Sequence, residues 1–139
     1  MARMTPDLAK KFLGVQKDGK LSKCPDMPNC VCSCYSEDAA HAIDPLIFQG
    51  SAEEAKARIK KVIGESKGFK IVEEKAEYMR VEVTSSLFKF VDDVEFLIKS
   101  SEKKIHLRSA SRLGKWDVGA NKKRMKLFAQ AFASATARG

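Results

Sequence analysis

The chain has 139 residues, of which 44% are hydrophobic and 32% charged, and its formal net charge is +8. This length predicts one domain over residues 1–139 and excludes two ordinary ones, and the composition excludes an intrinsically disordered chain. The positive charge attracts anions in general, so the candidate partners are an anionic small molecule, a lipid head group or an acidic protein, with nucleic acid a weaker alternative.

Residues 1–50 are predicted to form a long irregular arm. This part contains all four prolines and all four cysteines and shows neither helical nor strand periodicity. We expect it to wrap on the rest of the domain without a core of its own. No stretch reaches the roughly 18 apolar residues of a membrane span, and the first residues lack the apolar core of a signal peptide, so no transmembrane segment is predicted in this chain.

Residues 51–139 are predicted to form the folded core, which begins with a helix over 51–65. Ser51 and Glu54 form a capping box, in which each side chain bonds a free backbone N–H of the first turn. Apolar residues then recur at helical spacing, at Ala52, Ala55, Ile59, Val62 and Ile63. Gly64 or Gly68 ends the helix.

Four strands and a second helix are predicted next. Apolar and polar residues alternate over 69–74, 78–83, 94–99 and 105–108. The short links between them favour antiparallel hairpins, because parallel strands need long crossovers. A helix over 119–136 can cover the apolar face with Met125, Phe128, Phe132 and Ala135. The predicted fold class is therefore α+β, an antiparallel four-stranded sheet with two helices packed on one face, in the order arm-α-β-β-β-β-α.

The four cysteines, Cys24, Cys30, Cys32 and Cys34, lie within eleven residues. This spacing does not match the paired two-thiol knuckles of structural zinc sites, so neither a metal nor a cofactor is predicted. The prolines between Cys24 and Cys30 bend the loop enough for a disulfide between them. Reduced thiols, or a metal or redox role, remain as alternatives. A disulfide would imply an oxidising compartment and reduced thiols a cytosolic one.

A second group of candidate residues is acidic. Asp92, Asp93 and Glu95 lie at the start of the predicted third strand, with Asp93 and Glu95 on one side and Asp92 on the other. Two nearby carboxylates could divide general acid and base roles, or bind a hard cation. Ion pairs with arginines across the sheet are the simpler interpretation.

The third group follows the last predicted strand, in the turn from Arg108 to Arg124. Arginines and hydroxyl groups meet the start of a helix there, with Asp117 as its expected N-cap, and free N–H groups at a helix start can bind an anion. The candidate anion-binding residues are Arg108, Ser109, Ser111, Arg112, Asn121 and Arg124. A structural network with Asp92, Asp93, Glu95 and Asp117 would explain the same residues, and both interpretations can hold. The two histidines, His41 and His106, are not expected to form a catalytic triad with a cysteine or serine.

These blocks also carry a resemblance to a known family. The sequence resembles the domain of unknown function 1499 (DUF1499) family in order along nearly the whole chain. The matching blocks are Leu13-Gly-Val, Gly19-Lys-Leu21, Cys24-Pro-x-x-Pro-Asn-Cys-Val31, Ile43-x-Pro45, Gly50-Ser, Phe90-Val-Asp-Asp-Val-Glu-Phe96, Ile105-x-x-Arg-Ser-Ala-Ser-Arg112, Gly114 and Asp117-x-Gly-x-Asn121-x-x-Arg124. The family commonly has serines after its cysteine block, where this chain has Cys32 and Cys34. The resemblance implies no established reaction, cofactor or catalytic residue. It favours a bacterial envelope or periplasmic location, or an equivalent exported compartment, because many relatives carry N-terminal signals or membrane segments.

Three functional hypotheses follow. The first is a non-enzymatic binding or accessory domain that recognises an anionic group at the Arg108–Arg124 turn. The second is a hydrolase-like enzyme with Asp93 or Glu95 as the base and Arg108 or Arg112 stabilising the transition-state charge. The third is nucleic-acid binding through a continuous basic face.

Overall fold

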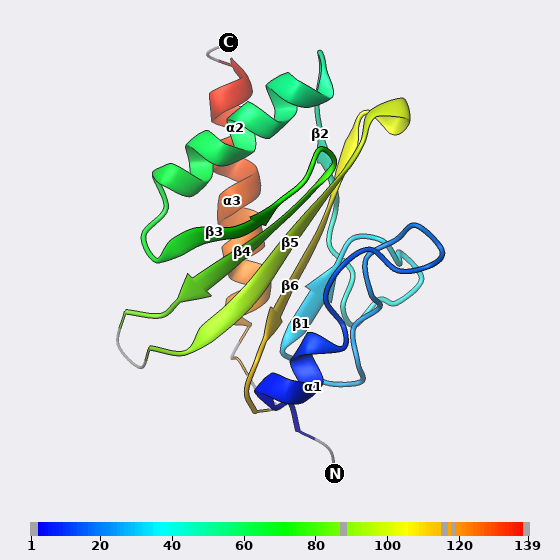
Figure 1. The fold of residues 1–139 in the computed structure, drawn as a ribbon, viewed down its shortest axis with the longest axis vertical. Coiled ribbons are helices and arrows are strands. Elements are labelled where there is room, and N and C mark those ends of the chain that lie inside the picture. The colour runs from blue at the N-terminus through cyan, green and yellow to red at the C-terminus, as the bar shows by residue number, and fades with distance from the viewer. Residues whose placement is uncertain (1–2, 87–88, 115–116, 118, 138–139) are drawn as a thin grey trace.

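The computed structural model describes residues 3–86, 89–114, 117 and 119–137. Within these residues the fold combines α-helices with one six-stranded antiparallel sheet (Figure 1). The elements are α1 (Pro6–Lys10), β1 (Cys30–Cys32), β2 (Leu46–Ile47), α2 (Ala52–Gly64), β3 (Phe69–Glu74), β4 (Tyr78–Thr84), β5 (Val91–Lys99), the 3-10 helix η1 (Ser100–Glu102), β6 (Lys104–Ser111) and α3 (Ala120–Ala137). None of the described helices is long and apolar enough to cross a membrane.

The sheet has the order β1-β6-β5-β4-β3, and β2 also pairs with β6. The four predicted strands form its consecutive antiparallel part, β3 to β6. The prediction of only four strands was wrong, because β1 and β2 of the arm add to the free edge of β6. These strands have three and two residues, too few to show an alternating pattern, and their partner lies far away in the sequence.

Residues 1–50 are therefore less irregular than predicted. They contribute β1, β2 and the short helix α1. The third predicted strand also begins earlier than expected, because β5 starts at Val91. Asp92, Asp93 and Glu95 consequently lie inside a strand and not at its start.

Two helices cover one face of the sheet, called the inner face below (Figure 1). The predicted capping box of α2 is confirmed: Ser51 Oγ accepts from the N–H of Glu54 at 3.0 Å, and Glu54 Oε1 accepts from the N–H of Ser51 at 3.1 Å. In α3, the Phe128 ring lies 5.0 Å from Phe96 and 6.2 Å from Phe69, measured between ring centroids. The inner face therefore carries the main apolar core.

The turn between α2 and β3 depends on Gly68. Its φ is +84°, which side chains of L residues rarely adopt, and a Cβ there would lie 2.5 Å from the carbonyl oxygen of Thr84. The N–H of Thr84 donates to Gly68 O at 3.0 Å. Glycine therefore lets this turn approach the end of β4 closely.

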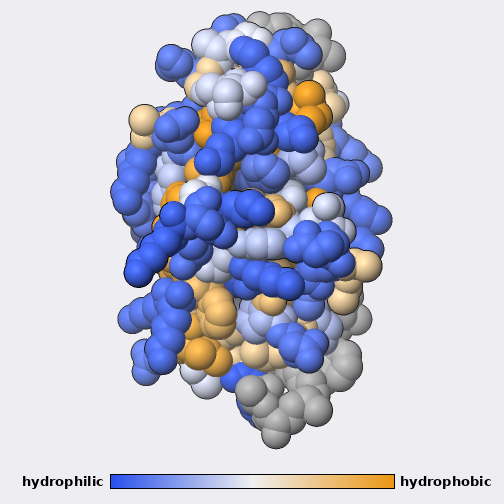
Figure 2. All heavy atoms as spheres, turned by 90° about the vertical axis from the view of Figure 1, so that its right-hand side faces the viewer, coloured by the Kyte–Doolittle hydropathy of each residue, from blue (hydrophilic) through white to orange (hydrophobic). Residues whose placement is uncertain are grey.

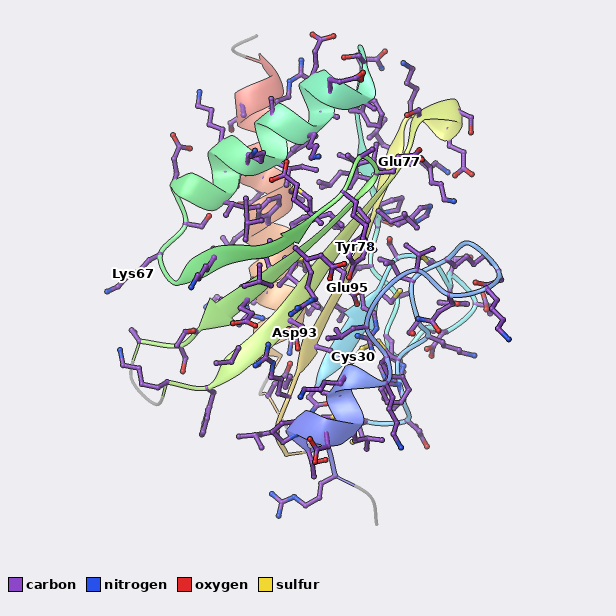
Figure 3. The ribbon with its side chains drawn as sticks, in the orientation of Figure 1. Cys30, Lys67, Glu77, Tyr78, Asp93 and Glu95 are labelled. Carbon is purple, nitrogen blue, oxygen red and sulfur yellow. A yellow bond between two sulfur atoms is a disulfide. The ribbon has the colours of Figure 1, made fainter. Side chains whose placement is uncertain are left out.

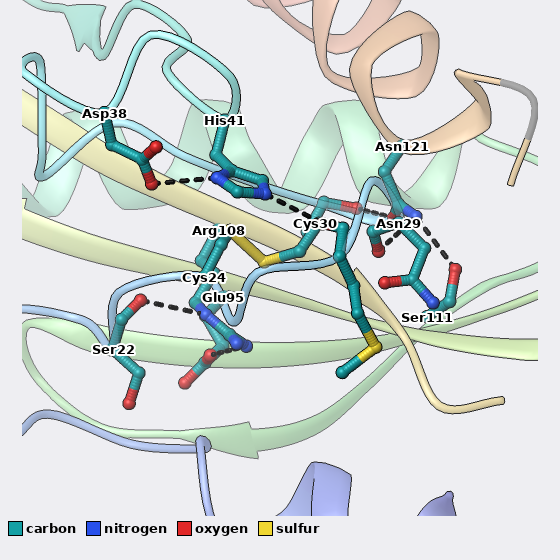
Figure 4. The surroundings of a disulfide bond; sticks show 12 residues. Ser22, Cys24, Asn29, Cys30, Asp38, His41, Glu95, Arg108, Ser111 and Asn121 are labelled. Carbon is teal, nitrogen blue, oxygen red and sulfur yellow. Dashed lines mark hydrogen bonds and ion pairs between the residues drawn. A yellow bond between two sulfur atoms is a disulfide. The ribbon is translucent and has the colours of Figure 1, made fainter. Parts of the chain in front are cut away.

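The arm lies against the other face of the sheet, called the outer face below (Figure 1). Its loop is closed by the Cys24–Cys30 disulfide, as predicted, with 5.7 Å between the two Cα atoms. The buried His41 bonds Asp38 at 2.8 Å and the carbonyl of Met27 at 2.7 Å (Figure 4). The side of the molecule shown in Figure 2 is mostly hydrophilic, with small apolar patches between the charged groups.

Candidate functional site

Strand β6 carries three of the predicted site residues, Arg112 directly follows it, and the alternation along this segment divides the four residues between the two faces. Arg108 and Arg112 point to the outer face, and Ser109 and Ser111 point to the inner face. The six candidate residues of the Arg108–Arg124 turn therefore form separate outer and inner groups. This division follows from the two-residue period of a strand. The sequence could have predicted it if the last predicted strand, over 105–108, had been continued to Ser111.

The centre of the outer face is a buried ion pair between Glu95 of β5, which is labelled in Figure 3, and Arg108 of β6 (Figure 4). Arg108 Nη1 lies 3.5 Å from Glu95 Oε1, and the two residues are 1% and 0% exposed. Glu95 Oε2 also accepts from the Tyr78 hydroxyl at 2.6 Å and from the N–H of Gly14 at 2.7 Å. Burial raises the pKa of Glu95, against the lowering effect of Arg108.

The arm closes over this pair. Arg108 Nε donates to the carbonyl of Ser22 at 3.0 Å, and its guanidinium lies over the Phe12 ring at 5.7 Å. Its Nη2 atom is buried and has no hydrogen-bond partner among the described residues. The pair thus ties the arm to the sheet, and it is closed to solvent.

A second ion-pair network lies beside it on the outer face, around Asp93. Arg112 binds this carboxylate with two hydrogen bonds of 2.9 Å, from Nε and Nη2, and Arg80 donates to it at 3.1 Å. Arg112 Nη2 also donates to Glu82 at 2.7 Å. The bonds to Asp93 and Glu82 raise the pKa of Arg112. The acidic residues thus pair with arginines, which is the simpler of the interpretations drawn from the sequence.

The inner-face group is centred on Asn121, which is fully buried at the start of α3. Its Nδ2 donates to Asp117 at 2.7 Å, to Ser111 Oγ at 3.0 Å and to the carbonyl of Asn29 at 3.2 Å. Its Oδ1 accepts from Arg124 at 2.8 Å and from the Ser109 hydroxyl. Asn121 therefore joins β6, α3 and the arm (Figure 4).

Backbone N–H groups at the start of α3 already donate to a carboxylate of the protein itself. Asp117 accepts from the N–H of Gly119 at 2.8 Å and from the N–H of Asn121 at 3.1 Å. Arg124 pairs with Asp92 at 2.9 Å on the same side. Burial raises the pKa of Asp92, although Arg124 acts in the opposite direction.

Arg124 also borders a hollow of about 280 Å³ between α3 and the turn from α2 to β3. The residues that line this hollow are Ser66, Phe69, Arg124, Leu127, Phe128 and Ala131. Its walls are mainly apolar, and Leu127 is 56% exposed. Sequence reasoning gave Leu127 no role, because an apolar position on a helix carries no sign of whether it is covered.

The two remaining cysteines, Cys32 and Cys34, are not disulfide-bonded. Cys34 contacts His106, which was not expected from the sequence to form a catalytic triad with a cysteine or serine. Within the residues that the structure describes, no group of three or more His, Cys, Asp or Glu side chains is arranged to hold a metal ion.

The model of the family "Protein of unknown function (DUF1499)" matches residues 20–132. Neither the curated proteins nor the solved structures contain a match to the chain.

Proposed function

The chain belongs to the DUF1499 family, and we propose that it is a non-enzymatic binding domain for an anionic amphiphile, a molecule with an acidic head and an apolar tail. The observation that supports this proposal is the place of Arg124 at the edge of the apolar hollow. Arg124 is the one charged side chain among the described residues that line it. All three arginines pair with carboxylates, but Arg108 and Arg112 do so on the outer face, away from the hollow, whereas Arg124 pairs with Asp92 at its edge.

The apolar tail would lie along α3 in this proposal. Phe69, Leu127 and Phe128 offer it aromatic and aliphatic surface, and covering the exposed Leu127 side chain removes apolar area from water. Pockets for small molecules typically combine such apolar walls with a few polar groups that fix orientation. The hollow is small, which favours one alkyl chain over a bulky ring system.

The acidic head would meet Arg124, whose side chain is 16% exposed. Guanidinium groups bind planar or tetrahedral anions through several N–H donors at once. Asp92 competes for this guanidinium, and its raised pKa means that it is protonated more readily than an ordinary carboxyl as pH falls. Binding of a head group that stays charged should therefore strengthen towards acid pH.

The test is calorimetric titration of the full chain with octyl sulfate, below the concentration at which it forms micelles. Octanol, which has the same chain without the charge, should bind at least about tenfold more weakly, since a charge-assisted contact contributes about 1.5–3 kcal/mol. Leu127→Gln should weaken octyl sulfate binding, because it places a polar group in the apolar wall. Leu113→Gln is the matched control, since Leu113 is 49% exposed and does not line the hollow.

Two results would overturn the proposal. Equal affinities for octyl sulfate and octanol would show that Arg124 does not bind the charged head group. Equal effects of Leu127→Gln and Leu113→Gln would show that the hollow is not where the chain binds.

The hydrolase alternative receives less support from the geometry. Glu95 is held by Arg108, Tyr78 and Gly14 beneath the arm, and Asp93 is held by two arginines. A general base must reach a substrate proton, which these buried carboxylates do not. Nucleic-acid binding is also weaker, because the arginines of the outer face alternate with Glu82 and Asp93 instead of forming a continuous basic face. An exported location agrees with the Cys24–Cys30 disulfide, because such bonds persist in oxidising compartments.

A further inference from the structure

The register of β1 on β6 continues past the end of β1. Cys32 is the Cα partner of Arg108, and the N–H of Ser33 donates to the carbonyl of Leu107 at 2.8 Å. Cys34 follows in a turn, and its side chain is hydrogen-bonded to His106, so the thiol and the imidazole meet on the outer face.

The imidazole of His106 is held in position by its neighbours. Its Nδ1 lies 3.0 Å from Ser33 Oγ, which also accepts from the N–H of Leu107 at 2.8 Å. Its Nε2 lies 3.7 Å from Glu102. The ring is therefore fixed beside Cys34 and not merely close to it.

Cys34 is half-buried, whereas Cys32 is buried, and neither sulfur is in a disulfide. The two thiols also share a hydrogen bond, because the strand ends at Cys32 and the chain then turns. The site thus combines the half-buried sulfur of Cys34 with two partners that contact it, His106 and the buried thiol of Cys32. This arrangement is typical of a cysteine that reacts and a cysteine that resolves the product.

The surroundings favour a thiolate at Cys34. The hydrogen bond from the Cys32 thiol has the largest effect on Cys34, and the bond from His106 acts in the same direction. Together they lower the pKa of Cys34 to about 5, although burial acts in the opposite direction. The bond to Cys34 raises the pKa of His106, and it raises the pKa of Cys32 as well. Among the charged and titratable groups, Arg108 and His106 act on the thiols, Glu102 acts on His106, and Tyr35 lies near both thiols. Asp18, Lys20 and Glu37 lie around Tyr35.

We propose that Cys34 and Cys32 form a thiol–disulfide exchange site for low-molecular-weight disulfides, on the opposite side of the sheet from the apolar hollow. The Cys34 thiolate attacks one sulfur of a disulfide RSSR, a new S–S bond forms between Cys34 and that sulfur, and the S–S bond of RSSR breaks. The released RS⁻ takes up a proton.

Cys32 resolves the mixed disulfide. Once Cys34 carries no charge, Cys32 loses its proton to solvent and attacks the Cys34 sulfur, which releases the second RS⁻. The balance is two protein thiols and one RSSR giving the Cys32–Cys34 disulfide and two RSH. The protein is oxidised and the small disulfide is reduced.

The experiment uses the full chain, purified with the Cys24–Cys30 disulfide intact, and oxidised glutathione at pH 6. The free glutathione released is measured with time, and peptide mapping identifies each sulfur bond. We expect a transient glutathione adduct on Cys34, then the Cys32–Cys34 disulfide, with two glutathione molecules released per chain.

Three variants separate the roles. Cys34→Ser should release no glutathione. Cys32→Ser should stop at the mixed disulfide with one molecule released, because nothing resolves it. His106→Gln should slow the first step at pH 6 by at least about tenfold and move its pH profile upwards, since the thiolate fraction falls faster than nucleophilicity rises.

Three results would overturn the proposal. One is a rate at Cys34 no faster than at a cysteine of the urea-unfolded chain at the same pH. A second is a pH profile of His106→Gln identical to that of the unchanged protein. The third is a product in which Cys34 is bonded to Cys24 or Cys30, which would show rearrangement of the existing disulfide instead.

Discussion

On the inner face of the sheet, β6 presents Ile105 and Leu107 to the apolar core beneath α2 and α3, whereas on the outer face it presents His106 and Arg108 to the arm. The inner contacts are numerous and have no preferred direction, so each can adjust when a neighbour changes. The outer contacts are few, and each depends on one partner atom, such as the carbonyl of Ser22 for Arg108. The difference predicts that the inner face tolerates substitution and the outer face does not.

The largest effect should come from Arg108→Met. The new side chain is apolar and of similar length, but it leaves Glu95 buried without its cation. Removing one partner of a buried pair typically costs about 3–5 kcal/mol of unfolding free energy. Urea denaturation at pH 7 measures this loss.

The loss should also depend on pH. The pKa of Glu95 is already raised in the folded protein, and losing Arg108 raises it further, so the charge penalty is absent at low pH and grows as pH rises through that folded pKa. The double variant Glu95→Gln/Arg108→Met buries no charge and should recover part of the stability. A loss that is the same at pH 5 and pH 8 would contradict this explanation.

The second effect, of intermediate size, concerns the disulfide of the arm. The double variant Cys24→Ser/Cys30→Ser opens a short loop, which costs about 2 kcal/mol in the chain-entropy model. The arm rests on the outer face, so faster hydrogen exchange should appear at Gly14, whose N–H bonds Glu95, before it appears in α2. Exchange that rises equally in both places would indicate that the arm and the core unfold as one unit.

The smallest effect should come from Leu107→Met, the same new residue at the neighbouring position. Leu107 is as buried as Arg108 but faces the core. Leucine and methionine have similar volumes, and such swaps usually cost less than about 1.5 kcal/mol. Urea denaturation of the two variants compares the two faces directly. If Leu107→Met lost as much unfolding free energy as Arg108→Met, the difference between the faces would be contradicted.

The sequence predicted the elements whose signals are local. The capping box at Ser51 and the four alternating segments needed only neighbouring residues, and the disulfide joins cysteines six positions apart. The opposite orientations of Asp92 and Asp93 also followed from the period of a strand.

Features that depend on distant pairing were missed. Cys30–Cys32 forms a strand because it pairs with β6, which lies much later in the chain. The meeting of Cys34 with His106 needs that same register, so no pattern around either residue could reveal it. Leu127 was missed for a related reason, since the hollow at its side exists only where the turn from α2 to β3 meets α3.

The pairing of β1 with β6 also sets an order of events during synthesis. A ribosome produces the arm well before Lys104–Ser111, so Cys30, Val31 and Cys32 leave the exit tunnel with no strand to join. The Cys24–Cys30 loop can close by itself in this interval, because both cysteines are already present. The bridge between Met4 and Gly114 then joins almost the first residue described to the last turn before α3. The arm is therefore synthesised before the sheet but can take its place only after β6 has formed, and Glu95 and Arg108 remain hydrated until it does.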